Sequence, residues 1–404
     1  MFRISLRSKI TGCLFAFSTG LILLVSSTFA TAAATEKAWS ERTAQTLMQE
    51  FPDKPWLMRK SDGHYKWSYT HALVLKGIEH IYRKTRDKRY LNYIKSYADH
   101  FIDRDGNIDT FTVWEYNIDS LNAGKMLFLL YEESGDDRYL KAMQSLRAQL
   151  NWHPRTSEGG FWHKLKYPWQ LWLDGSYMAG PFYAEYEVRF GSGSEGLEDI
   201  VNWYRLLERR TRDPKTGLLY HGWDESRVQR WADKTTGLSA NFWSRAMGWY
   251  AMALVDTIEV FPEDNLGRLE MIDMLRRLVD ALVAFQDESG LWYQVTDQGN
   301  RKGNYLEASG SSMFVYSIAK AVRLGVLPAS YQAVADKGYR GLLTELVSVD
   351  PRGRILLKNI CRSAGLGGDP YRDGSYEYYL SEDVVVNDAH GVGSFILASV
   401  EMGQ

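Results

Sequence analysis

The sequence has 404 residues, of which 45% are hydrophobic, and its formal net charge is -2. A chain of this length can bury a large core, and a charge so close to zero, with no basic stripe, argues against nucleic acid or an anionic membrane surface as the partner. Aromatic residues are abundant, with 14 Trp and 25 Tyr. Aromatic rings stack on sugars or pack a core, so composition leaves both interpretations open.

The first 34 residues have the features of a secretory signal peptide. Basic side chains lie within the first nine positions, an apolar run spans 10–25, and small residues follow. We expect cleavage after a position between Ala30 and Ala34, leaving one catalytic domain over 35–404. The apolar run is shorter than the about 20 residues of a membrane anchor. The sequence therefore predicts an exported protein without an anchor. Of the two exported locations, we expect the periplasm rather than the outside of the cell.

From residue 37 onward, apolar residues recur three and four positions apart, which is the spacing of one face of an α-helix. An internal repeat supports a pairing of these helices, because the pattern of Tyr82–Ser96 recurs in Tyr131–Ser145. The spacing predicts twelve helices, over 37–50, 67–82, 90–101, 119–132, 137–150, 175–190, 196–211, 241–260, 267–286, 308–324, 329–347 and 388–401.

The links between these helices alternate between short and long. The long ones are 104–118, 151–174, 212–240, 287–307 and 348–387. Loops of that length are uncommon unless they are functional. The alternation predicts an all-α fold, a single-domain (α/α)6 barrel in which each long loop leads into an inner helix and each short link into its outer partner. Helix 37–50 would close the ring against 388–401, and polar residues of the long loops would converge on one site.

Two aspartates, Asp119 and Asp174, stand at the expected starts of inner helices. An Asp there can simply cap the helix, a role worth roughly 1 kcal/mol. Against that interpretation, Trp162, Trp169 and Trp172 crowd the approach to Asp174, and desolvation raises the pKa of a carboxyl. The helix dipole opposes this effect by only roughly 0.3 to 1 kcal/mol. We therefore expect a protonated Asp174 near neutral pH, which is the state of a general acid.

Other polar residues carry weaker signals. His163 and His221 lack the HExxH spacing of a zinc site, and the sequence shows no cysteine cluster or nucleotide-type glycine loop, so we expect no metal and no cofactor. Arg245 lies in an otherwise apolar predicted helix, where it requires an anionic partner. That partner is either a structural Asp or Glu or the carboxylate of a substrate.

Four segments resemble, in the same order, the motifs of the unsaturated rhamnogalacturonyl hydrolases of glycoside hydrolase family 105. They are Leu171–Tyr183, His221–Glu225, Trp231–Asp233 and Asn241–Ala253. The likeness covers essentially the whole chain after the leader and implies the (α/α)6 barrel that the helix pattern also predicts. Ser176 departs from the motif, because many members have a larger side chain there, and we expect the change to affect the subsite for the leaving sugar.

The resemblance implies hydration chemistry on a terminal uronic acid that a lyase has left with a C4=C5 double bond. Asp174 would protonate C4 and help water to add to C5, and the resulting hemiketal would collapse and release the next sugar. Asp119 would raise the pKa of Asp174 or position the water. The substrate-binding residues that the resemblance implies are His163, His221, Trp243, Arg245, Trp249 and Trp172, with Arg245 opposite the uronate charge.

Several functions fit this pattern. The first is removal of an unsaturated galacturonyl residue from rhamnogalacturonan fragments by a monomeric enzyme whose partner is an unsaturated acidic oligosaccharide. Unsaturated β-glucuronyl residues on ulvan- or arabinogalactan-type fragments are the alternative substrate. An ordinary inverting glycosidase that uses Asp119 and Asp174 as a pair, and a non-catalytic glycan-binding barrel, are the other two interpretations.

Overall fold

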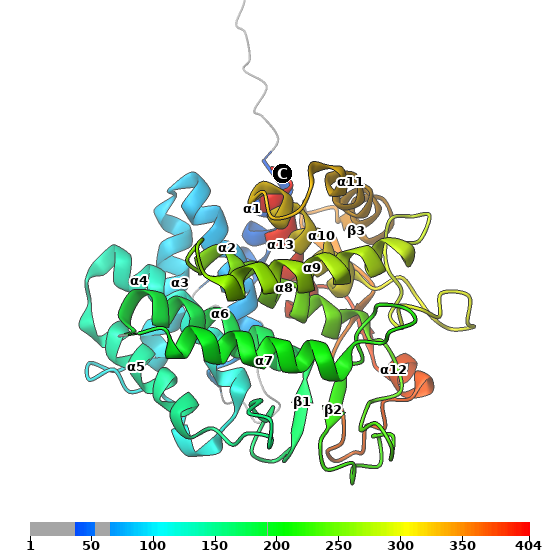
Figure 1. Ribbon diagram of the computed structural model, residues 1–404. Coiled ribbons are helices and arrows are strands. Elements are labelled where there is room, and N and C mark those ends of the chain that lie inside the picture. The colour runs from blue at the N-terminus through cyan, green and yellow to red at the C-terminus, as the bar shows by residue number, and fades with distance from the viewer. Residues whose placement is uncertain (1–36, 53–64, 192) are drawn as a thin grey trace, which may run out of the picture. The chain divides into compact units, whose positions relative to one another are not determined.

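The computed structural model describes residues 37–52, 65–191 and 193–404, so the predicted signal peptide lies outside the described residues. The helices (Figure 1) are α1 (Trp39–Glu50), α2 (Tyr69–Thr85), α3 (Lys88–Phe101), η1 (Val113–Glu115), η2 (Ile118–Gly124), α4 (Lys125–Ser134), α5 (Asp137–Trp152), α6 (Leu173–Phe190), α7 (Glu195–Thr211), α8 (Ser244–Val260), α9 (Leu266–Ala284), α10 (Ala308–Arg323), η3 (Ala329–Tyr331), α11 (Gln332–Gly341), η4 (Leu342–Leu346), α12 (Tyr376–Ser381) and α13 (Ala389–Glu401). Within these residues, no helix is both long and apolar enough to cross a membrane.

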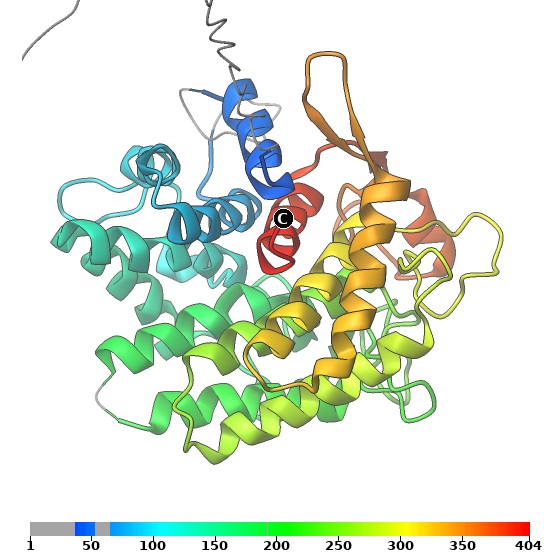
Figure 2. The same cartoon turned by 90° about the horizontal axis from the view of Figure 1, so that it is seen from above.

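The helices form a ring of six pairs, which confirms the predicted (α/α)6 barrel. The inner ring consists of α2, η2 with α4, α6, α8, α10 and α13, and each of these packs against the next. The outer partners are α3, α5, α7, α9, α11 and α1 in the same order. Seen from above, α1 lies beside α13, so the first and last helices close the ring as predicted (Figure 2).

Burial explains which helices lie inside. Every residue of α8 from Ser244 to Ile258 is buried, because an inner helix contacts neighbours on all sides. Its contact with α10 is close at Gly248, where an added Cβ would come within 2.8 Å of the Met313 side chain. By contrast, the outer helix α3 buries only one face, with exposed residues between its buried tyrosines. The spacing of apolar residues in the sequence therefore indicates whether a helix belongs to the inner or the outer ring.

The internal repeat corresponds to a shared turn between two helix pairs. Asp87 caps α3 and accepts a hydrogen bond from the backbone N–H of Arg89, and Asp136 caps α5 and accepts one from Arg138. Such caps satisfy N–H groups that have no partner inside the helix. The repeat thus marks the short links between inner and outer helices, as the sequence predicted.

Short antiparallel strand pairs occur in the long loops, where the sequence predicted no strand. β1 (Gln170–Trp172) pairs with β2 (Gly222–Asp224), β3 (Val347–Val349) pairs with β4 (Ile355–Leu357), and β5 (Ile360–Cys361) pairs with β6 (Val384–Val385). Helix boundaries also differ from the prediction. The segment expected to begin a helix at 119 begins as the 3-10 turn η2, and α6 begins two residues earlier than predicted because β1 leads directly into it. The β1–β2 pair thereby fixes the backbone just before Asp174.

Candidate functional site

The first turns of the inner helices bring polar residues together around one pocket. Tyr69 is the first residue of α2, Asp119 is the second of η2, and Asp174 is the second of α6. All three line a cavity of about 130 Å³, which we call the inner pocket. Its other lining residues come mainly from the long loops, and they are His163, Lys164, Tyr167, Trp172, Met178, Ser363, Ala364 and Arg372. The barrel geometry therefore gathers the residues as the loop alternation predicted.

Neither aspartate is a helix cap. Asn117 caps η2, with its side-chain oxygen accepting a hydrogen bond from the backbone N–H of Asp119 (3.2 Å). The residue at the N-cap of α6 is Trp172, which makes no side-chain capping bond. Since capping does not occupy the two carboxylates, both face the inner pocket, and the interpretation of these residues as caps is wrong.

Asp174 is in contact with a histidine from a distant loop. The Nε2 atom of His221 lies 3.1 Å from Oδ2 of Asp174, and the Nδ1 atom of His221 lies 2.7 Å from the hydroxyl of Tyr379. Burial raises the pKa of Asp174, but the charge and hydrogen bonding of His221, together with His163, outweigh burial and hold that pKa below its ordinary value. The expectation of a protonated Asp174 in the free protein is therefore wrong, because the residue that decides it is remote in sequence.

Asp119 has two basic neighbours. It forms an ion pair with Lys164, and Nε2 of His163 lies 3.5 Å from its Oδ1. Burial lowers the pKa of His163 to about 4, although Asp119 partly opposes the effect. His163 is therefore neutral near pH 7, and Lys164 supplies the positive charge beside Asp119.

Aromatic rings form one wall of the inner pocket. His163 stacks on Trp172 with ring centroids 4.3 Å apart and planes at 14°. Tyr167 stacks on the same indole at 4.8 Å and 25°. The indole N–H of Trp172 donates to the side chain of Gln170 (3.1 Å), which fixes the ring. This stack holds the imidazole of His163 against Asp119.

Besides His221, which is wholly buried and does not line the inner pocket, three predicted binding residues lie behind the pocket wall. Trp243, Arg245 and Trp249 are each 1% exposed and do not line the inner pocket. Trp243 packs against His221 at 4.8 Å between ring centroids, and Nη1 of Arg245 lies 4.0 Å from a carboxylate oxygen of Glu307. The structure thus gives Arg245 a structural anion as its partner, and contact of these three residues with substrate stays a prediction.

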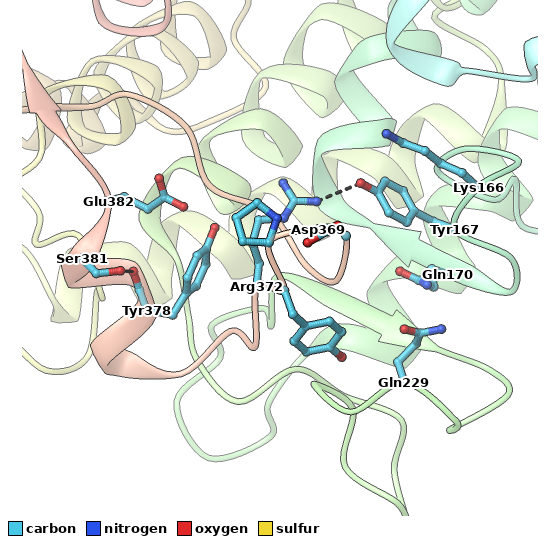
Figure 3. A pocket seen from close by; sticks show the side chains of 12 residues that line it. Lys166, Tyr167, Gln170, Gln229, Asp369, Arg372, Tyr378, Ser381 and Glu382 are labelled. Atoms are coloured by element: carbon cyan, nitrogen blue, oxygen red, sulfur yellow. Dashed lines mark hydrogen bonds between the residues drawn. The ribbon is translucent and has the colours of Figure 1, made fainter.

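A second, wider cavity of about 950 Å³ adjoins the inner pocket, and we call it the outer cavity. Tyr167 and Arg372 line both, and Arg372 donates a hydrogen bond from Nη2 to the Tyr167 hydroxyl (2.8 Å) where the two meet. Figure 3 shows Lys166 and Gln170 on one side of the outer cavity and Glu382 on the other, with Arg372 between them. The outer cavity is therefore a wide space, lined largely by polar residues, that adjoins a small inner pocket.

Ser176 lies outside both cavities. Its side chain is wholly buried and donates to the backbone oxygen of Leu173 within the first turn of α6. The expected effect of this residue on the leaving-sugar subsite therefore has no contact to support it, because the side chain points into the helix packing.

Sequence reasoning missed Tyr69, Lys164 and Arg372. Lys164 directly follows the predicted His163, and Arg372 lies in a glycine-rich part of the longest loop, so both were within reach of a search for cations near the proposed uronate. Tyr69 carried no signal beyond its place at a helix start. Among the described residues, no cluster of three or more His, Cys, Asp or Glu side chains is arranged to hold a metal ion.

The opposite ends of the inner helices surround another cavity, the rear cavity, of about 340 Å³. Its lining is almost entirely charged: Lys76, Glu79, His80, Arg83, Lys125, Pro181, Glu185, Arg189, Asp256, Glu259, Val260, Lys320 and Arg323. At its centre, Nζ of Lys320 lies 2.7 Å from both Asp256 and Glu259. Six Lys or Arg and four Asp or Glu side chains therefore lie together in this lining.

The sequence pattern of Glycosyl Hydrolase Family 88 matches residues 39–404. A solved glycoside hydrolase from family 105 of C. acetobutylicum ATCC 824 is 46% identical, has a TM-score of 0.86, and covers 91% of this chain and 99% of its own. The chain belongs to glycoside hydrolase family 105. It is a glycoside hydrolase of the group that acts on unsaturated uronyl residues in polysaccharide breakdown.

Two curated proteins add detail to the family 105 assignment. The unsaturated rhamnogalacturonyl hydrolase YesR of Bacillus subtilis is 27% identical over 300 residues, which is 72% of this chain and 78% of YesR. Protein Atu3128 of Agrobacterium fabrum is 41% identical over 230 residues, or 55% of this chain and 97% of its own length.

Proposed function

We propose that this family 105 protein removes the terminal 4,5-unsaturated galacturonyl residue from lyase-generated rhamnogalacturonan oligosaccharides. The contact between Asp174, which lines the inner pocket, and the buried His221 carries the proposal, because it joins a carboxyl group to a group that can supply or accept its proton. The similarity to YesR, named for this activity, supports the choice of galacturonyl substrate.

The shape and charge of the two cavities suit an enzyme that acts on chain ends. The small inner pocket suits one sugar ring, and Lys164 and Arg372 in its lining offer positive charge to a uronate carboxylate. The outer cavity then receives the next sugar, with amide and hydroxyl groups such as those of Gln170, Gln229 and Tyr378 in its lining. In this proposal, the bond to be broken lies near Tyr167 and Arg372, where the cavities meet.

The proton chemistry follows from the charge of the substrate. An anionic uronate beside Asp174 raises the pKa of that carboxyl, and His221 at 3.1 Å is placed to hand it a proton. Asp174 then protonates C4, and its carboxylate takes a proton from the water that adds to C5. The hemiketal opens and the next sugar leaves. One carboxyl group serves the whole sequence, unlike the two that ordinary glycosidases require.

The test follows the ultraviolet absorbance of the conjugated double bond in a lyase-generated rhamnogalacturonan disaccharide. We expect wild-type protein to remove it, and Asp174→Asn to be slower by roughly 10²- to 10⁴-fold, the usual contribution of a positioned acid. Asp273→Asn is the matched control, since Asp273 is an exposed partner of Arg276 on an outer helix. Full activity of Asp174→Asn would contradict the mechanism.

The same assay separates the other interpretations. Activity on unsaturated β-glucuronyl fragments alone would move the substrate to ulvan- or arabinogalactan-type chains. Release of sugar from saturated galacturonides would favour an inverting glycosidase that pairs Asp119 with Asp174. Tight binding of oligosaccharides without turnover would leave a glycan-binding barrel.

A further inference from the structure

A chain of three hydrogen-bonded side chains, of which His390 is buried and Asp388 and Tyr69 are partly buried, ends at the inner pocket. Oδ1 of Asp388 lies 2.6 Å from Nδ1 of His390, and Nε2 of His390 lies 3.0 Å from the hydroxyl of Tyr69. His390 is 3% exposed, and Tyr69 lines the inner pocket together with Asp119 and Asp174. The chain joins the first turn of α13 to the first residue of α2, two inner helices that pack side by side.

The direction of these hydrogen bonds follows from the charge of Asp388. Burial raises the pKa of Asp388, but the ring and the backbone N–H of His390 outweigh burial and keep that pKa below its ordinary value. The carboxylate therefore accepts from the backbone N–H of His390 (3.0 Å) and from Nδ1–H. In the neutral imidazole, Nε2 is then the acceptor, and Tyr69 donates its hydroxyl proton to it.

This order leaves the lone pairs of the Tyr69 oxygen directed at the pocket. Burial and the charge of Asp119 raise the pKa of Tyr69 far above its ordinary value, so the phenol keeps its proton. Trp249 supports the arrangement, because its indole packs edge-on against Tyr69 and His390, with centroids 6.3 and 6.4 Å away. A phenol oxygen held in this way can accept a proton only while passing its own to His390.

We propose that Tyr69 is a second catalytic residue, and that His390 and Asp388 position it and take its proton during opening of the hemiketal. This proposal rests on the proposed function. The hydroxyl proton on C5 moves to the Tyr69 oxygen, and the proton of Tyr69 moves to Nε2 of His390. The oxygen on C5 becomes the carbonyl, and the bond from C5 to the ring oxygen breaks. The ring oxygen takes a proton from Asp174, which gained it from the added water.

The imidazolium formed at His390 is stabilised by the carboxylate of Asp388, as in other His–Asp pairs. When the remaining hemiacetal at C1 collapses, its hydroxyl proton goes to Asp174. The proton on His390 returns through Tyr69 to the oxygen of the leaving sugar. Asp174 then returns to His221 the proton that it received at the start, so Asp174, His221 and His390 all end in the states in which they began.

A substrate-free measurement tests the hydrogen-bonded chain by itself. Nitrogen NMR of selectively labelled histidine should show His390 protonated at Nδ1, with a shift at Nε2 on Tyr69→Phe. Asp388→Asn keeps the size of the capping side chain but removes its charge, so we expect a fraction of the His390 rings to carry the proton on Nε2 instead of Nδ1. An Nε2-protonated ring in wild-type protein would overturn the proposed direction, whether or not the proposed function holds.

Single-turnover kinetics test the catalytic role. In wild-type protein, loss of absorbance and release of the next sugar should coincide. In Tyr69→Phe, we expect the absorbance to fall at nearly the wild-type rate and sugar release to lag by roughly 100-fold, the lower range for a positioned proton-transfer group. Equal slowing of both signals, or no lag, would overturn the proposal. Failure of wild-type protein to remove the absorbance would instead overturn the proposed function.

A double-variant cycle separates this role from structural damage. His390→Phe keeps the ring packing and should reproduce the lag, and adding it to Tyr69→Phe should change nothing further. Additive effects would show that His390 acts independently of Tyr69. Tyr204→Phe is the matched control, because it also removes a buried hydroxyl bond (2.9 Å to Thr257), and it should leave both signals coincident.

Discussion

The two ends of the inner helices differ in how their charges are partnered. At the inner pocket, buried polar atoms without a well-aligned hydrogen bond include Oδ2 of Asp174, Nε2 of His221 and Nδ1 of His163. At the rear cavity, no lining side chain in the described part of the chain has such an atom. Buried polar groups are normally satisfied. Incomplete hydrogen bonding of buried polar atoms, rather than charge content, therefore distinguishes the end that holds the proposed site.

The largest predicted change in stability should come from breaking the ion pairs of Lys320 with Asp256 and Glu259, which we call the rear network. Lys320→Met keeps most of the packing but leaves Asp256, which is 7% exposed, with the Tyr316 hydroxyl as its remaining partner at 2.7 Å. Leaving a buried charge unpaired costs about 3–5 kcal/mol. We expect the free energy of unfolding in urea to fall by that amount, while kcat of the folded protein is unchanged.

The control for this variant is Arg276→Met, because the pair of Arg276 with Asp273 is more than half exposed at both ends. Exposed pairs contribute about 0–1 kcal/mol. A Lys320→Met protein as stable as Arg276→Met would show that the rear network is not structural.

A second prediction concerns acid, since each end holds a histidine that is neutral near pH 7. Burial lowers the pKa of His163 to about 4 at the inner pocket and that of His80 to about 3 at the rear cavity. Between pH 6.5, the ordinary pKa of histidine, and pH 4, these histidines become protonated in the unfolded chain but stay neutral in the native chain. The free energy of unfolding therefore falls as pH falls. At 1.36 kcal/mol per pKa unit, each histidine accounts for about 3 kcal/mol.

The measurement is the urea midpoint at pH 7, 5.5 and 4. Carboxylates whose pKa lies below the ordinary value lose most of their contribution at still lower pH. Burial raises the pKa of Glu185 and Asp297, so these two groups add stability as pH falls. A fall in the midpoint within this window therefore reports the histidines. His80→Gln should flatten the dependence. Equal midpoints for wild-type protein at all three pH values would contradict the assignment of neutral histidines.

The smallest predicted effect lies at the junction of the inner pocket and the outer cavity. Arg372→Lys keeps the positive charge but loses the forked hydrogen bonds to Tyr167 (2.8 Å) and the backbone of Gly367 (2.7 Å). We expect KM for the unsaturated disaccharide to rise about tenfold, or about 1.4 kcal/mol, with kcat nearly unchanged. A fall in kcat with constant KM would assign Arg372 to the chemistry rather than to binding.

The fold was largely predictable because helix periodicity and loop length are local properties of the sequence. The ring, its closure and the repeated turn capped by Asp87 and Asp136 all follow from them. The start of α6 was misplaced, since it depends on the pairing of Leu171 with Trp223 across 52 positions. Local patterns do not report such pairing.

The site was predictable only where residues carried a motif. The structure places Asp119, Asp174, His163 and Trp172 around one pocket. The charge state of Asp174 could not be predicted, because its Coulombic partner, His221, comes from another loop. Lys164 and Arg372 lie in loops without periodicity, where a cation is ordinarily just solvated.

Closure of the ring has a consequence for the kinetics of folding. The hydroxyl of Ser40 donates to the backbone oxygen of Gln404 (2.7 Å), across a separation of 364 positions. Contacts between such distant segments carry a large loop-closure entropy and form slowly. The same event brings α13, with His390, against α2 and Tyr69. During refolding, hydrolytic activity should therefore return later than the helical circular dichroism signal. The delay between the two signals would measure the rate at which the ring closes.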